Sequence, residues 1–251
     1  MKQLIKDNYK FMLFLLFFGL VGGIFTAVYS VDSLSPELLA EVTKQLGSTE
    51  LLLIILTLQS ILYAVILGLI GKYLAKKVGL WKELTFEKKP LLAVALVSIV
   101  TGAALILFDV LIFNHFSDVI KESYQTKPTF AYIMAALTYG GVVEEVMLRL
   151  FFMSLLSFLL YKLFVKNEKE VPTVIFITAN IISALLFAAG HLPATAAMMS
   201  LTPAILIRCF LLNGGAGLFF GRLYRKYGIQ YAMLAHIGCH VISKLIWVVF
   251  L

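Results

Sequence analysis

The chain has 251 residues, of which 61% are hydrophobic and only 14% are charged, and its mean hydropathy is +0.96. A water-soluble domain is nearer half apolar and about a quarter charged, so the composition excludes an ordinary soluble protein. The net charge of +7 does not indicate nucleic-acid binding, because the lysines and arginines lie mostly in short connections and form no basic stripe.

Seven apolar runs follow one another along the chain, and almost every run is close to the roughly 20 residues that a bilayer requires. Backbone polar groups in lipid must be paired within their own segment, so the runs are predicted to be helices. Continuous apolar runs also exclude a membrane β-barrel. We therefore predict an all-α polytopic transmembrane bundle with spans at 9–31, 51–71, 90–114, 129–164, 172–191, 203–221 and 229–250.

The run at 129–164 is too long for one helix perpendicular to the membrane. It is expected to tilt, to kink at Gly140-Gly141, or to break into two pieces, which makes the bundle one of seven or eight helices. Cys209 and Cys239 both lie inside apolar runs, where small, buried, unpaired thiols are expected.

Lysines and arginines alternate between rich and poor connections along the chain. The N-terminal tail carries three, the successive connections carry one, six, two, three, none and three, and the C-terminus carries none. Positively charged loops stay in the cytoplasm, so the N-terminus is predicted to be cytoplasmic and the C-terminus to lie outside. The protein is predicted to be an integral, multi-pass component of a lipid bilayer.

Ionisable side chains inside apolar runs are costly in a membrane and are therefore candidates for function. Asp109 and Lys244 are expected to line a cavity or snorkel, Arg208 to anchor a helix, and none of the three to be catalytic. The complete set is Asp109, Glu144, Glu145, Arg149, His191, Arg208, His236, His240 and Lys244.

One group of these residues is Glu144-Glu145-Val-Met-Leu-Arg149. On a helix, Glu145 and Arg149 share one side with the acid N-terminal to the base, which is the favourable order for an ion pair. Glu144 lies about 100° further around and remains free for other work. The alternative is a purely structural set of charges at a wet helix end.

Three of the four histidines lie in two later helices. His191 ends an apolar run just before Pro193, and His236 and His240 project from one face, where they could grip a metal ion, donate to an oxyanion, or pack structurally. Their occurrence together with the two glutamates indicates a catalytic or metal site. Convergence of His191 with His236 requires strong tilt, or a fifth helix that continues past Pro193.

At these residues the chain resembles the CPBP family of intramembrane proteases, the CAAX protease and bacteriocin-processing proteins, also called the ABI family. The resemblance covers Tyr139 to Trp247 and rests on the motifs EExxxR, FxxxH and HxxxN in that order. In this chain the motifs read Glu144-Glu145-xxx-Arg149, Phe187-xxx-His191 and His236-xxx-His240. The last motif departs from the family, which has Asn at the position of His240.

The resemblance implies a membrane-embedded endopeptidase that hydrolyses a membrane-associated peptide or protein. It implies a setting in a bacterial cell membrane, in bacteriocin or signal-peptide processing or in self-immunity. It also implies a division into an N-terminal three-span region, 1–127, and a catalytic helical core, 128–251. The competing function is a non-catalytic immunity or regulatory protein that binds a peptide or partner in the same cavity.

Peptide hydrolysis needs an activated water molecule and a stabilised oxyanion. We assign Glu144 as the general base and His191 as the residue that holds the water or shares the proton, with His236 and His240 as oxyanion donors. The neighbouring Glu145–Arg149 pair would fix the helix. In the alternative, a metalloprotease, Glu144, His191 and His236 bind Zn²⁺ with or without His240, and the metal activates the water. The sequence does not decide between the two schemes.

Overall fold

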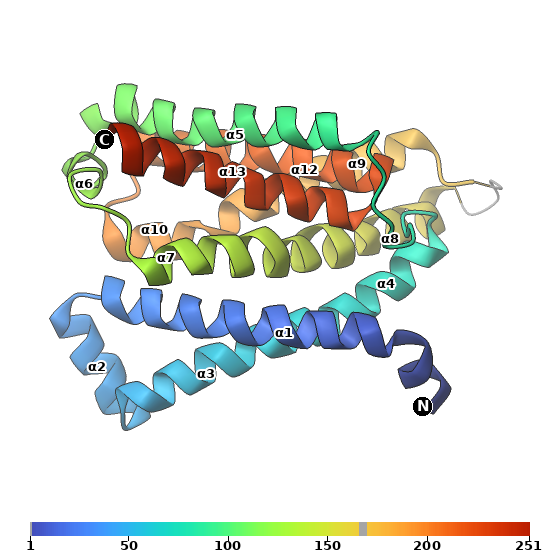
Figure 1. Cartoon of the computed structure of the whole chain (residues 1–251), viewed down its shortest axis with the longest axis horizontal. Coiled ribbons are helices and arrows are strands. Elements are labelled where there is room, and N and C mark those ends of the chain that lie inside the picture. The colour runs from blue at the N-terminus through green and yellow to red at the C-terminus, as the bar shows by residue number, and fades with distance from the viewer. Residues whose placement is uncertain (1, 166–169) are drawn as a thin grey trace.

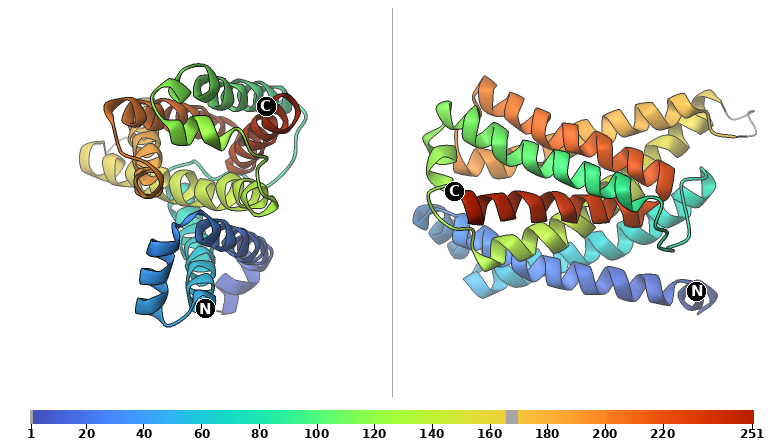
Figure 2. Two further views of the ribbon diagram at one scale, coloured as in Figure 1. Left: turned by 90° about the vertical axis from the view of Figure 1, so that its left-hand side faces the viewer. Right: turned by 45° about the horizontal axis from the view of Figure 1, so that its top comes forward.

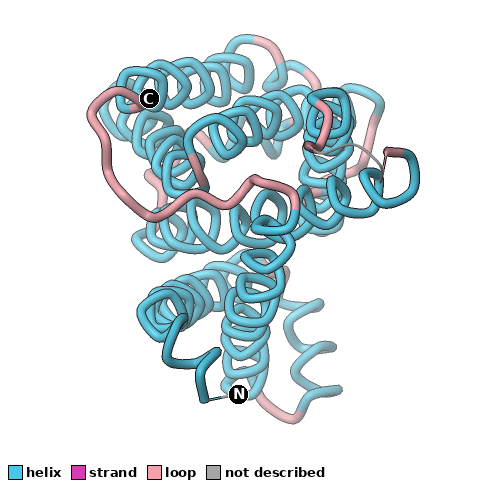
Figure 3. Tube along the Cα trace, turned by 90° about the vertical axis from the view of Figure 1, so that its right-hand side faces the viewer, coloured by secondary structure: helices cyan, strands magenta, loops and turns pink. Residues whose placement is uncertain are grey.

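A computed structural model of the chain describes residues 2–165 and 170–251. Within these residues the protein is helical and contains no strand (Figure 3). Seven helices in the described part are long and apolar enough to cross a membrane. The all-α polytopic prediction is therefore confirmed. The spans are Asn8–Asp32, Thr49–Lys77, Leu91–His115, Phe130–Phe164, Thr173–Met198, Pro203–Tyr227 and Ile229–Phe250.

Several spans consist of consecutive α-helical, 3₁₀-helical and π-helical elements. The elements are α1 (Lys2–Ser33), α2 (Pro36–Leu46), α3 (Thr49–Leu62), η1 (Tyr63–Leu67), α4 (Gly68–Lys77), α5 (Leu91–Leu111), η2 (Phe113–His115), α6 (Asp118–Ser123), α7 (Phe130–Ala135), η3 (Ala136–Glu144), η4 (Val146–Met153), α8 (Ser154–Phe164), α9 (Thr173–Gly190), α10 (Leu192–Met198), α11 (Pro203–Cys209), η5 (Phe210–Gly214), α12 (Gly215–Tyr227) and α13 (Ile229–Phe250).

The long helices form two groups on either side of the α7–α8 helix (Figures 1 and 2). On one side α1 packs against α3 and also against α7 and η3. On the other side α13 packs against η3, α5 and α12, and α9 packs against η4 and α12. The η3–η4 segment therefore has neighbours on both sides and lies at the centre of the fold.

The predicted division at 127/128 falls in the loop before α7. However, α5, which precedes that loop, packs against α13, which follows it. The division into two regions stays a prediction.

The orientation of the protein in the membrane, with a cytoplasmic N-terminus, also stays a prediction. The two termini lie at opposite ends of the bundle (Figure 1), as an odd number of spans requires. Lys166 and Lys169, which the loop-charge argument used, lie outside the described residues.

The long fourth span is one uninterrupted helix that does not break at Gly140-Gly141. Its middle consists of two π-helical stretches, η3 and η4, and Glu145 lies between them. The wider π-helical turn changes which side chains share a face, and such turns are frequent at functional sites.

The fifth span is longer than predicted because the chain remains helical beyond His191. The backbone of His191 is itself helical, with φ −83° and ψ −15°, and α10 continues to Met198 with Pro193 in its first turn. Proline is tolerated there because the first N–H groups of a helix have no intrahelical partner. The continuation past Pro193 is one of the two conditions stated for bringing His191 to His236.

The last two helices are joined by a single residue, Gly228, which has a φ of +112°. A side chain is strained in this backbone conformation, and glycine is not. Elsewhere, Cys209 and Cys239 are both buried free thiols, as predicted.

A buried ion pair connects α5 to α11. Arg208 donates from Nε to Asp109 Oδ1 and from Nη2 to Oδ2, both at 2.6 Å. Tyr124 also donates to Asp109, at 2.8 Å. Burial and the charge of Asp109 raise the pKa of Tyr124 above its ordinary value, so this hydroxyl keeps its proton. Arg208 thus anchors a helix, as expected.

Close packing of α5 on α13 predicts that Gly102→Ala destabilises the protein. A Cβ at Gly102 would lie 2.5 Å from the Cys239 carbonyl oxygen and 2.8 Å from Ile242 Cβ. Overpacking of this kind costs about 1–3 kcal/mol. Thermal unfolding in one detergent should show a lower midpoint. Gly215→Ala is the control, because a Cβ at Gly215 meets no atom within 4 Å. An equal effect of the two substitutions would contradict the described packing.

Candidate active site

Glu145 lies at the centre of a buried charge cluster that joins η4 to α13. Its Oε1 atom is 3.2 Å from Nη1 of Arg149 and 2.9 Å from Nδ1 of His236. Glu145 and Arg149 are 0% and 1% exposed, so both charges are removed from lipid and water. The predicted pairing of Glu145 with Arg149 is present, and His236 is a second partner that the sequence did not indicate.

Two aromatic rings and one glycine enclose the Arg149 guanidinium. Its central carbon lies 4.5 Å from the Phe187 ring and 5.6 Å from the Phe220 ring, which favours the cation electrostatically. A Cβ on Gly217 would lie 2.8 Å from Nη2 of Arg149. The Gly217 position must therefore remain small for the guanidinium to occupy this place.

Glu144 has a different environment from its neighbour. It is half-buried, and it forms no ion pair with any described residue. A Cβ on Gly140 would lie 3.0 Å from Nε2 of His240 and 3.9 Å from Oε2 of Glu144. His240 and Glu144 thus approach the same backbone position, and the missing side chain of Gly140 leaves room for both.

The two histidines of α13 lie in a stack of rings. His236 stacks on Phe220 at 4.5 Å and on His240 at 4.9 Å, and it meets the edge of Phe187 at 5.7 Å. Because Nδ1 of His236 bonds to a carboxylate, we assign its proton to Nδ1, which leaves Nε2 as the other ring nitrogen. Packing on three sides and one hydrogen bond fix the orientation of this imidazole.

His191 joins the cluster through Phe187. The Phe187 ring meets the His191 ring edge-on at 4.8 Å, and it contacts the His236 ring as well. Nδ1 of His191 is 2.8 Å from the Phe187 carbonyl oxygen, so this nitrogen carries the proton and donates it. Nε2 of His191 is then an acceptor that can hold a water molecule.

Four of the six predicted site residues form a chain of direct contacts: Arg149, Glu145, His236 and His240. Glu144 approaches His240 beside Gly140, and His191 is connected to His236 through the Phe187 ring. Sequence reasoning missed Phe220 as a wall of the cluster, because an aromatic residue in an apolar run carries no signal of its own. The two cavities found elsewhere in the described part are lined by none of the six residues. The catalytic roles of the six stay predictions.

The zinc alternative requires Glu144, His191 and His236 to converge on one point. No three described residues of the His, Cys, Asp and Glu types are arranged so that they could hold a metal ion. Nδ1 of His236 is hydrogen-bonded to the Glu145 carboxylate, and Nδ1 of His191 is hydrogen-bonded to the Phe187 carbonyl oxygen, so neither nitrogen is free to bind a metal ion. Because the arrangement does not fit a metal centre, no step is derived through one. Metal dependence stays a matter for experiment.

Comparison with known proteins gives one match. Residues 126–242 match the family described as "Type II CAAX prenyl endopeptidase Rce1-like". The matched segment is 117 of the 251 residues, and over it the chain is similar to this CAAX protease family. Searches of curated proteins and of solved structures give no match to the chain.

The family match covers all six predicted site residues, although it ends at residue 242, within α13. It agrees with the resemblance inferred from the motifs. The Rce1-like family is a family of proteases, so the match supports a peptidase-type function in an integral, multi-pass membrane protein with a peptide or protein substrate.

The contrast between the two glutamates predicts different effects on stability. Glu145→Gln leaves the buried Arg149 charge without a counter-ion, which should cost about 3–5 kcal/mol. Glu144→Gln removes no ion pair and should change stability by about 0.5 kcal/mol or less. Thermal unfolding of both variants in the same detergent measures the difference. Similar losses in the two variants would be incompatible with the described pairing.

Proposed function

We propose that the protein is an intramembrane endopeptidase that cleaves a membrane-associated peptide or protein with water activated by Glu144. The observation that carries the proposal is the separation of two adjacent carboxylates. Glu145 is paired with Arg149 and His236, whereas Glu144 is half-buried, unpaired and close to His240. Carboxylates held in such different environments commonly take different roles in acid–base chemistry.

In the proposed reaction, Glu144 takes a proton from a water molecule held by Nε2 of His191. The water oxygen bonds to the carbonyl carbon of the scissile peptide bond, and a tetrahedral oxyanion forms. Glu144 then returns the proton to the amide nitrogen as the carbon–nitrogen bond breaks. The immediate products are a carboxylic acid and an amine, the acid then passes its proton to the amine, and the Glu144 carboxylate is restored.

His236 and His240 are proposed to stabilise the oxyanion. The bond from Nδ1 of His236 to Glu145 holds the ring in place. In the doubly protonated form of the ring, whose charge Glu145 would offset, Nε2 also carries a proton, and this proton points away from the ion pair. His240 stacks on His236 and brings its own Nε2 to the side of Gly140 where Glu144 lies. Donors that are already in position lose little on reorganisation, which is why such groups stabilise an oxyanion strongly.

The biological setting that we propose is bacterial, in bacteriocin or signal-peptide processing or in self-immunity. The resemblance of the three motifs to the CPBP family supports this setting. The competing proposal, a non-catalytic immunity or regulatory protein, is supported by the closed packing of Arg149 and His236. Substitution of Glu144 separates these two proposals, because a peptidase would lose its function with this carboxylate and a non-catalytic protein would retain its function.

Glu144→Gln should abolish peptide processing and leave the protein in the membrane. The substitution removes the base and preserves the shape, and loss of a general base lowers rates by about 10²–10⁴. Peptide profiles of cells that carry the wild type or the variant measure the effect. Asp118→Asn, a change of an exposed acid outside the cluster, is the control. Unchanged processing in the Glu144→Gln cells would remove Glu144 from the role of base.

Substitutions of His240 separate the two mechanistic schemes. If His240 donates to the oxyanion, His240→Asn restores the usual family residue and should retain much of the activity, whereas His240→Ala should lose about 10²–10³ in rate. If His240 binds zinc, both variants should lose metal and activity together. Cleavage rate and bound zinc are measured on the three proteins. An active, zinc-free His240→Asn protein would exclude zinc as a requirement.

A further inference from the structure

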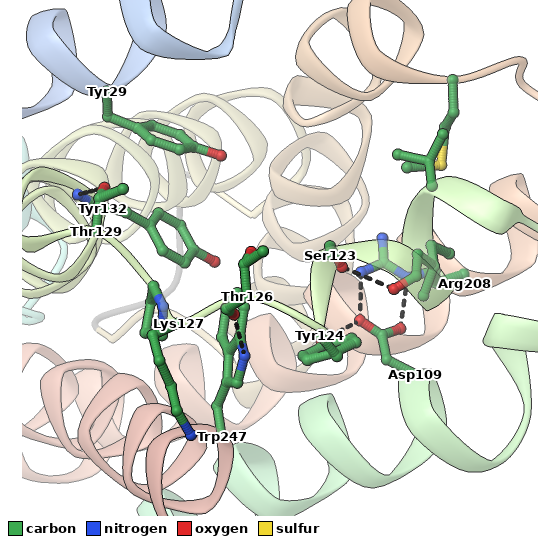
Figure 4. Close-up of a pocket in the computed structure, with 14 residues that line it drawn as sticks. Tyr29, Asp109, Ser123, Tyr124, Thr126, Lys127, Thr129, Tyr132, Arg208 and Trp247 are labelled. Atoms are coloured by element: carbon green, nitrogen blue, oxygen red, sulfur yellow. Dashed lines mark hydrogen bonds and ion pairs between the residues drawn. The ribbon is translucent and has the colours of Figure 1, made fainter. Parts of the chain in front are cut away.

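A second polar region lies at the end of the bundle that carries the C-terminus. A cavity of about 270 Å³ opens there between α1, α5, α6, α7, α11 and α13 (Figure 4). Its lining combines aromatic rings with charged groups and includes Tyr29, Asp109, Tyr124, Tyr132, Arg208 and Trp247. None of the six proposed site residues contributes to this lining.

A buried cation, Lys244, contacts two of the residues that line the cavity, Tyr132 and Trp247. Lys244 is only 6% exposed, and its Nζ atom lies 4.2 Å from the centre of the Tyr132 ring and 5.6 Å from that of Trp247. Nζ also donates to the Tyr132 hydroxyl at 3.0 Å. No carboxylate of a described residue pairs with it. Buried charges are normally paired, so a buried ammonium without a counter-ion indicates that an anion is bound from outside.

The charges around the cavity are unequal. Arg208 is neutralised by Asp109, which it binds with two hydrogen bonds. Lys127 lines the cavity and donates to the Val248 carbonyl oxygen, and it has no acidic partner among the described residues. Lys127 in the lining and Lys244 directly behind Tyr132 and Trp247 therefore leave an excess of positive charge around this part of the cavity.

Tyr132 transmits the charge of Lys244 to the cavity. An ammonium group can only donate, so the Tyr132 oxygen accepts from Lys244, and the phenolic proton remains available for another acceptor. The hydroxyl groups of Tyr29 and Tyr132 both point into the cavity (Figure 4). A hydroxyl that already accepts from a cation is a strengthened donor, and carboxylates are preferred acceptors for such donors.

One face of α13 carries residues of both the proposed catalytic cluster and the cavity lining. His236, His240 and Lys244 follow one another at intervals of four residues, and Trp247 continues the same stripe. At 1.5 Å per residue, Trp247 lies only about 10 Å beyond His240 along the helix axis. A short extended peptide segment can bridge this distance, because each residue spans about 3.3 Å.

We propose that this cavity is a substrate subsite that binds a carboxylate group of the peptide, held by the Tyr132 hydroxyl, which the Lys244 ammonium strengthens as a donor. The inference rests on the proposed peptidase function, since it places the bound peptide across the Glu/His cluster. The carboxylate belongs either to an acidic side chain or to the free C-terminus of the peptide. Both sources present the same chemistry to the site, and the test distinguishes them.

The protein contains two tryptophans, and Trp247 lines the cavity. In a Trp81→Phe protein, tryptophan emission therefore reports on this site alone. Three probes are titrated in detergent: N-acetylphenylalanine, which has a terminal carboxylate; N-acetylglutamate α-amide, which has a side-chain carboxylate; and the neutral N-acetylphenylalanine amide. At least one acid should bind 10-fold or more tighter than the neutral amide, and the tighter acid identifies the source of the carboxylate.

Substitutions at Lys244 complete the test. Lys244→Met should abolish the preference for the acid, and Lys244→Arg should retain it. Lys77→Met is the matched control, because Lys77 also lies over a tyrosine ring, 5.4 Å from the centre of Tyr73, on a different helix. Equal binding of acid and amide to the Trp81→Phe protein, or a preference that survives in Lys244→Met, would overturn the proposal.

The binding test also separates this inference from the proposed function. All titrations are repeated in the Glu144→Gln background, which lacks the proposed base. Acid preference without any detectable proteolysis in the wild type would support the subsite and contradict the peptidase function. Cleavage by the wild type without acid preference would contradict the subsite alone.

Discussion

A positive charge buried within a bilayer is costly unless it is compensated, and the Arg149 guanidinium is the charge on which the described cluster depends. Glu145 neutralises it, and the Phe187 and Phe220 rings close the space around it. Because Glu145 also binds His236, the requirement to pair one arginine fixes the distance between η4 and α13. The geometry that the proposed chemistry needs is thus a by-product of the need to bury a charge.

The same electrostatic rule explains why neighbouring residues of this protein serve different purposes. Glu145 and Asp109 each neutralise an arginine and are almost fully buried. Glu144 and Lys244 have no such partner among the described residues, although both lie in membrane-spanning helices. Paired charges connect helices to one another, and unpaired charges are available to water or to a ligand.

Sequence reasoning predicted features that arise within one segment. The seven spans, the buried thiols and the Glu145–Arg149 pair follow from apolar length and from spacing along one helix. Features that join distant segments were not predictable. The Asp109–Arg208 pair joins residues 99 positions apart, and the bond from Glu145 to His236 joins residues 91 apart. The π-helical turns around Glu145 also have no signature in composition, and they lie where α1 and α13 pack on η3.

The packing of α5 against α13 has a consequence for biosynthesis. Ser98 on α5 donates to the Ala235 carbonyl oxygen, which is 137 residues further along the chain. When α5 enters the membrane, its partner helix has not yet been synthesised. Until then Ser98 bonds only within its own helix, to the Val94 carbonyl oxygen, and the groove at Gly102 faces lipid or the translocon. The native bundle therefore closes late, when the final span arrives and displaces whatever has covered that groove.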